Sequence, residues 1–223
     1  MAHDLTAEPP RFVIFEGVDG SGKTTLARAL ADYYRELTPE MPLYADNFPG
    51  SRPGTLGEWV YRLHHGRATD APSPREIAPP ALQLLHVAAH VDLILTHIGP
   101  TLRAGGGVIL DRYWWSTYAY SRMVLPPEKV WPMVGAERVF WAELPAPVAV
   151  YLTREATLKA DELAPTAHRA LDAHYREVIA AERQAGTPVH VLSNDTTLAD
   201  VWHALLDALG LPPRPLPATV AST

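Results

Sequence analysis

The stretch FEGVDGSGKTT, residues 15–25, decides how the rest of this 223-residue sequence is interpreted. From Gly17 to Thr24 it fits the pattern G-x-x-x-x-G-K-[ST] at every fixed position. It follows the apolar run RFVIFE and opens a helical pattern, which is the setting in which such a loop binds phosphate. The three observations together favour a phosphate-binding loop over a glycine-rich turn with a chance lysine.

The residue types in this loop suit a nucleotide and its metal ion. Glycines let backbone N–H groups converge on phosphate oxygens, and the N-terminus of the following helix adds partial positive charge. Lys23 is placed to reach the outer phosphates, and Thr24 to bind Mg²⁺. We therefore predict that ATP and Mg²⁺ bind to the whole loop, formed by Gly17, Val18, Asp19, Gly20, Ser21, Gly22, Lys23, Thr24 and Thr25.

Outside the loop, short apolar runs alternate with longer helical patterns. The runs lie at residues 11–16, 42–47, 107–111, 147–152 and 188–193. Helices are predicted over residues 23–37, over about 81–103, and from Asp195 or Thr196 to Leu209. This alternation predicts one α/β domain over residues 11–210, a three-layer α/β/α P-loop NTPase fold with a central parallel sheet of about five strands.

The ends of the chain and its composition set further limits. Residues 1–10 and 211–223 are rich in Pro, Ala and Thr, so we expect two flexible ends. A formal charge of -6 argues against a surface for duplex nucleic acid, and the absence of cysteine excludes disulfides and thiolate sites. We find neither a signal-peptide pattern nor an apolar run of the ~20 residues that cross a membrane, and we expect a cytoplasmic protein.

A second acidic position completes the predicted metal site. The apolar run Val108–Leu110 ends in Asp111, which is suited to hold a metal-bound water near the phosphates. An ordinary turn that begins with aspartate is the alternative. The sequence lacks the N-K-x-D motif with which a GTPase reads guanine.

Two motifs taken together bring a family into view. FEGVDGSGKTT and DRYWWSTYAY, residues 111–120, resemble the thymidylate kinase family, and so do FPGSRPGTLGEWV, residues 48–60, and the last strand and helix. The resemblance spans nearly the whole folded unit. It implies transfer of the γ-phosphate of ATP to a nucleoside monophosphate, with dTMP as the default acceptor, and a homodimer.

The resemblance also implies roles for single residues. It places Arg52 and Arg112 on the acceptor phosphate, which a guanidinium binds with two hydrogen bonds. It places Asp19 on the acceptor sugar, and Tyr113 and Tyr120 in the same site. The predicted catalytic residues are Lys23, Asp111, Arg112 and Arg154.

Arg154 belongs to the region in which the sequence departs from the family. The predicted lid, residues 153–170, is short and contains few basic residues. Its candidate cations are Arg154, Lys159 and Arg169, and we favour Arg154 because it lies nearest the end of the preceding strand.

The base-reading helix departs from the family as well. The family motif L-L-F-x-A-[DN]-R corresponds to residues 84–90, where His86 and His90 replace the phenylalanine and the arginine. Helical spacing puts both on one stripe with His97. A metal pair, structural histidines and substrate-facing histidines are all compatible with this stripe. Ser121 replaces the glutamine of the family, so an acceptor other than thymidylate is possible.

The sequence is also compatible with two other functions. In a nucleoside or small-alcohol kinase, Asp111 or Glu16 would act as a base toward a hydroxyl group. A catalytically degenerate member that binds nucleotide as a sensor would explain the thin lid and the altered base contacts.

Overall fold

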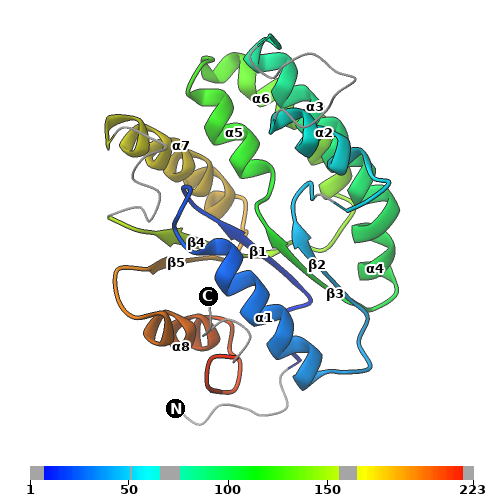
Figure 1. Ribbon diagram of the computed structural model, residues 1–223, viewed down its shortest axis with the longest axis vertical. Helices are drawn as coiled ribbons and strands as arrows, with labels where there is room; N and C mark the ends of the chain where they lie inside the picture. Colours follow the sequence, from blue (N-terminus) through cyan, green and yellow to red (C-terminus); the bar gives the residue numbers. More distant parts are fainter. Residues whose placement is uncertain (1–7, 51, 66–75, 156–164, 218–223) are drawn as a thin grey trace.

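The computed structural model describes residues 8–50, 52–65, 76–155 and 165–217. Its five strands form one sheet in the order β2-β3-β1-β4-β5, and every neighbouring pair is parallel (Figure 1). Each predicted strand is confirmed to within one residue at either end. The strands are β1 (Phe12–Glu16), β2 (Leu43–Asn47), β3 (Gly107–Asp111), β4 (Val148–Thr153) and β5 (Val189–Ser193).

Helices cover both faces of this sheet, which confirms the three-layer architecture. In Figure 1, α1 and α8 lie on one side, while α3, α5, α6 and α7 lie on the other. The helical segments are α1 (Lys23–Leu37), α2 (Leu56–His64), α3 (Pro79–Leu93), the π-helical turn η1 (Ile94–Ile98), α4 (Gly99–Arg103), α5 (Trp114–Arg122), α6 (Pro127–Trp141), α7 (Pro165–Gln184) and α8 (Leu198–Ala208).

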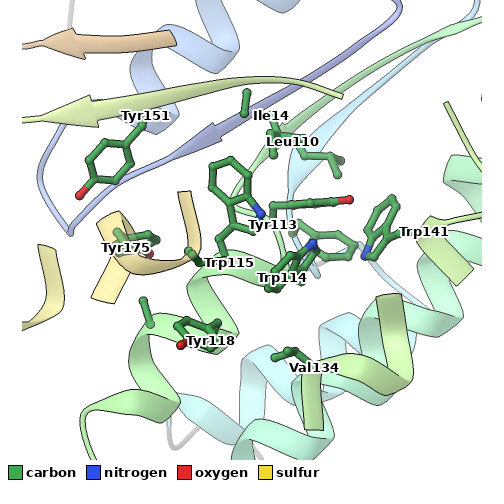
Figure 2. Close-up of a cluster of buried hydrophobic side chains, with 14 of the residues drawn as sticks. Ile14, Leu110, Tyr113, Trp114, Trp115, Tyr118, Val134, Trp141, Tyr151 and Tyr175 are labelled. Carbon is green, nitrogen blue, oxygen red and sulfur yellow. The ribbon is translucent and has the colours of Figure 1, made fainter. Parts of the chain in front are cut away.

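The central strand supplies both hydrophobic cores because its side chains alternate between the two faces. Val13 and Phe15 pack with α1 and α8. Phe12 and Ile14 pack with α5, α6 and α7 in a cluster rich in aromatic rings (Figure 2). Within that cluster Trp114, Trp115 and Tyr118 are at most 1% exposed. They are therefore core residues and do not stack on a ligand.

The long predicted helix over residues 81–103 is interrupted. Its first part is α3, and the π-helical turn η1 follows before α4. A π turn adds a residue to one turn of helix, so the 100° spacing no longer holds beyond it. His97 consequently leaves the stripe of His86 and His90: its ring lies 5.8 Å from that of Tyr44, and its Nδ1 lies 2.7 Å from the hydroxyl of Thr96.

This same run, Pro79–Arg103, has the length and hydropathy of a membrane-spanning helix. Buried core helices share these properties, and Val87, Leu93 and Ile98 on the run are at most 5% exposed within the domain. The expectation of no such apolar run is therefore corrected. Of its most apolar window, 39% is buried within the domain.

The structure adds detail at the C-terminal end. Thr197, rather than Asp195 or Thr196, caps α8, because its side chain accepts a hydrogen bond from the backbone N–H of Asp200. Part of the stretch predicted to be a loose tail packs on the domain. Leu211 is 2% exposed, and the indole N–H of Trp202 donates to the carbonyl oxygen of Arg214 at 2.9 Å.

Candidate functional site

The candidate site lies where the parallel strands end. Strand register pairs Asp111 of β3 with both Phe15 of β1 and Asn47 of β2, so the loops after these strands meet at one edge of the sheet. A cavity of about 670 Å³ opens there. Its walls come from the glycine loop, the ends of β2 and β3, and helices α2, α3 and α5.

The glycine loop has the backbone shape that its sequence predicts. Gly22 adopts a φ of 96°, and a Cβ at this position would lie 2.4 Å from the side-chain nitrogen of Asn194. That nitrogen donates to the carbonyl oxygen of Ser21 at 2.7 Å. Asn194, which follows β5, thus holds the loop from outside, a role that the sequence motif did not reveal. The loop residues that line the cavity are Asp19, Gly20, Gly22, Lys23, Thr24 and Thr25.

Lys23 lines the cavity although its side chain is almost fully buried. Its Nζ donates to the carbonyl oxygen of Val18 at 2.8 Å. Burial and the nearby Arg112 guanidinium lower the pKa of Lys23 to about 8. An anionic phosphate in the cavity would favour the charged form of this lysine.

Thr24 and Asp111 meet as the predicted metal site requires. The Thr24 hydroxyl donates to Oδ2 of Asp111 at 2.5 Å, and the Asn47 amide donates to the same oxygen at 3.3 Å. The other oxygen, Oδ1, is buried and has no hydrogen-bond partner within the described ranges. A hydroxyl and an unsatisfied carboxylate oxygen beside a phosphate loop form a donor set that fits Mg²⁺.

Arg112 occupies the opposite wall in a constrained backbone conformation. Its φ of 81° lies in the left-handed region, which costs energy for a residue with a Cβ and is typical of functional positions. Its guanidinium pairs with Asp19 and donates to the Ser116 hydroxyl at 3.2 Å. Burial alone would raise the pKa of Asp19, but Arg112 and a 2.6 Å hydrogen bond from Tyr120 lower it. The carboxylate of Asp19 is therefore held ionised between two cavity residues.

Glu16 lies behind this wall and fixes the start of α5. It accepts hydrogen bonds from the backbone N–H groups of Tyr113 and Ser116 and from the Ser116 hydroxyl, at 2.7–2.9 Å. Burial raises the pKa of Glu16 to about 7 against the opposing effect of Arg112. Its hydrogen bonds show a role in shaping the loop that carries Arg112.

Histidines line the cavity as well. His86 and His90 of α3 both line it, and so do Tyr113 and Tyr120. Burial, His90 and His64 lower the pKa of His86 to about 3, so its imidazole is neutral. Within the described ranges, no group of three or more His, Asp or Glu side chains is placed to hold a metal ion.

Several residues that line the cavity were missed by sequence reasoning. Gln83 precedes His86 by three residues and so shares its helical face, a signal that was present in the sequence. His64 is the last residue of α2 and His65 follows it. No local pattern in the sequence revealed the position of α2 over α3. The missed lining residues include Asn47, Phe48, Tyr61, His64, His65, Gln83 and Thr117.

Two predicted cations lie outside the cavity lining. The Arg52 guanidinium lies 4.7 Å from the centre of the Tyr44 ring, and its Nε is 3.7 Å from Asp46. Arg154 follows β4 and lies close enough to lower the pKa of Asp195, after the hydrogen bonds from Ser193 and Glu155. Residues 156–164 of the predicted lid, including Lys159, lie outside the described residues, while Arg169 is exposed on α7.

Comparisons with known proteins identify a family. The family model described as thymidylate kinase matches residues 15–128, which include the glycine loop, α3 and the Asp111–Tyr120 segment. A thymidylate kinase of Synechococcus sp. (strain RCC307) is 38% identical over 114 residues, which is 50% of this chain and 51% of that protein. The alignments with the first such relatives thus span about half of their length.

Two further comparisons extend over most of the chain. A thymidylate kinase of Bradyrhizobium diazoefficiens is 30% identical and aligns with 95% of this chain and 94% of its own length. The solved structure of a thymidylate kinase from Ehrlichia chaffeensis, 20% identical, has the same fold with a TM-score of 0.66 over 91% of this chain and 100% of its own. With its phosphate loop, its Asp111–Arg112 segment and this nearly full-length relative, the chain belongs to the thymidylate kinase family.

Proposed function

We propose that the chain transfers the γ-phosphate of ATP to a nucleoside 5′-monophosphate, with dTMP as the default acceptor. One observation carries the proposal: Lys23, Thr24 and Asp111 line the same cavity as Arg112, Asp19 and Tyr120. A phosphate donor at the glycine loop and an acceptor beside Arg112 would therefore face each other.

The charges of the cavity suit this reaction. Phosphoryl transfer between two anions needs positive groups around the moving phosphoryl, because negative charge develops on its oxygens. Lys23 and Arg112 supply two such groups, and Mg²⁺ held by Thr24 and Asp111 would supply another when bound. The nucleophile is already an anionic phosphate oxygen, so no general base is required.

Arg52 is proposed to bind the acceptor phosphate, although it does not contact the cavity in this structure. In this structure it pairs with Asp46 rather than lining the cavity. This ion pair is partly exposed, and such pairs contribute only about 0–1 kcal/mol, so an incoming phosphate can compete for the guanidinium. Arg154 remains the proposed lid cation.

A coupled assay for ADP release tests the proposal. The panel contains the common ribo- and deoxynucleoside monophosphates, each beside its nucleoside, with Lys23→Ala as the control variant. The proposal expects ADP release that depends on a monophosphate and is lost in the variant. Release with nucleosides alone would favour the nucleoside kinase, and nucleotide binding without any release would favour the sensor.

A further inference from the structure

A hydroxyl group on α7 reaches the buried side of the cavity wall that carries Arg112. It belongs to Tyr175, which is 0% exposed and whose ring centre lies 5.5 Å from that of Tyr151 on β4 (Figure 2). The hydroxyl oxygen lies 2.9 Å from Oγ of Ser116, in the first turn of α5. Because the ring is fixed in the core, its hydroxyl has a defined position relative to α5.

Ser116 is the point at which three other side chains meet. Its Oγ lies 2.7 Å from Oε2 of Glu16 and 3.2 Å from a guanidinium nitrogen of Arg112, and the Tyr175 hydroxyl is the third partner. A hydroxyl group has one hydrogen to donate and two lone pairs with which to accept. An ionised carboxylate only accepts and a guanidinium only donates, so Ser116 donates to Glu16 and accepts from Arg112. The second lone pair of Oγ is then left for the hydrogen of Tyr175.

The charge states of the network agree with this assignment. Burial, followed by the nearby Glu16 carboxylate, raises the pKa of Tyr175 well above its ordinary value, so the phenol keeps its hydrogen. Burial also raises the pKa of Glu16 to about 7, and above this pH the carboxylate is ionised. At pH 8 the hydroxyl of Ser116 therefore has its full set of one acceptor and two donors.

Arg112 needs support from its surroundings because its backbone is strained. Its φ of 81° lies in a region that a residue with a Cβ keeps only when neighbouring contacts hold it there. Its guanidinium pairs with Asp19 on the cavity side and contacts Ser116 behind it. The hydrogen bond from Tyr175 to Ser116 thus ties Arg112 to α7, although no α7 residue in the described part of the chain lines the cavity.

We propose that Tyr175 is a positioning residue for the acceptor phosphate: its hydroxyl donates to Ser116, which in turn holds the Arg112 guanidinium in the orientation that receives the phosphate. The inference rests on the proposed function, in which Arg112 binds the acceptor. Tyr175 acts through Ser116 and does not touch the nucleotide. Loss of its hydroxyl should therefore weaken binding of the acceptor much more than binding of the nucleotide at the glycine loop.

The test measures dissociation constants for dTMP and for Mg-ADP by titration calorimetry at pH 8, so the readout does not depend on turnover. Tyr175→Phe removes the hydroxyl and keeps the ring. We expect its Kd for dTMP to rise roughly three- to tenfold, as loss of one hydrogen bond predicts, and its Kd for Mg-ADP to change by less than about twofold.

Tyr118→Phe is the matched control. Tyr118 is also a fully buried tyrosine between α5 and α7, but its hydroxyl donates to Glu177 at 2.6 Å rather than to Ser116 (Figure 2). Its removal should lower the melting temperature and leave the Kd for dTMP at the wild-type value. Equal weakening of dTMP binding by Tyr118→Phe would assign the effect to general packing of α5 on α7 and would overturn the inference.

A double-mutant cycle tests whether Tyr175 acts through Ser116. Ser116→Ala should weaken dTMP binding at least as much as Tyr175→Phe does. Adding Tyr175→Phe to Ser116→Ala should then change the Kd by less than about twofold, because the partner of the phenol is already gone. Additive effects of the two substitutions would show that Tyr175 acts by another route, which also overturns the inference.

The remaining outcomes separate this inference from the proposed function. A purely structural role of Tyr175 would lower the melting temperature only, so a wild-type Kd for dTMP in folded Tyr175→Phe overturns the inference. If Tyr175→Phe does not fold, Ser116→Ala decides: weaker binding of dTMP supports the inference, and unchanged binding overturns it. Binding of dTMP by the wild type without any ADP release overturns the proposed function alone, whereas failure of the wild type to bind dTMP overturns the inference.

Discussion

At the residue scale, Glu16 connects the electrostatics of the cavity to the stability of the protein. Its pKa of about 7 means that the folded protein holds a proton that an unfolded chain has already released. Stability should therefore fall as pH rises from the ordinary carboxyl range to about 7, because the unfolded state binds fewer protons in this window.

Glu16→Gln tests this expectation with a near-isosteric change. One oxygen of the glutamine can accept from the N–H groups of Tyr113 and Ser116, and its NH₂ can donate to the Ser116 hydroxyl, as a protonated acid would. We expect chemical unfolding at pH 5 and pH 7 to show a smaller loss of stability in the variant than in the wild type. Equal losses in the two proteins would contradict the assigned pKa.

At the element scale, the position of α2 depends on the close packing of its backbone at Gly57 against the loop that follows β2. A Cβ on Gly57 would lie 2.2 Å from the carbonyl oxygen of Pro49, a backbone atom that has little room to move. Gly57→Ala should destabilise the protein, although alanine favours helix by up to about 1 kcal/mol. It should also raise KM for the acceptor, because α2 carries His64 and His65 to the cavity.

Gly135 on α6 provides the matched control. A Cβ there meets no atom within 4 Å. Gly135→Ala should therefore change only the helix propensity of this position and stabilise the folded protein by about 0.5–1 kcal/mol. Thermal unfolding of both variants measures the contrast. A Gly57→Ala variant as stable as Gly135→Ala would show that α2 does not need this contact.

Some elements of the fold could be predicted from the sequence, and others could not. The strands and the glycine loop were predicted because alternation of apolar runs and a fixed motif are local signals. His97 was misplaced because the π turn changes the helical spacing through packing that the sequence does not display. Glu137 lies 47 positions from His90, and only the packing of α6 on α3 brings them together. The charges of Lys23, Asp111 and Arg112 could be predicted by motif, because these residues line the cavity. The same reasoning misplaced Arg52, which pairs with Asp46 outside the lining.

At the scale of the whole molecule, the C-terminal segment closes the α1–α8 side of the domain. Tyr33 donates to the carbonyl oxygen of Pro212 at 3.0 Å, and Trp202 donates to that of Arg214. Truncation after Gly210 should lower the melting temperature, since it exposes Trp202 and removes the buried Leu211. Truncation after Pro217 keeps all of these contacts and serves as the control. Equal melting temperatures for the two truncated proteins would contradict the packing described for this segment.

The central claim is that two nucleotides meet across one cavity and exchange a phosphoryl group. ATP labelled at its γ-phosphate, incubated with Mg²⁺ and dTMP, measures this transfer directly when the products are separated. We expect label in dTDP with the wild-type protein, and almost none with Lys23→Ala or Arg112→Ala. Label found only in inorganic phosphate, or label in dTDP that survives both substitutions, would contradict it.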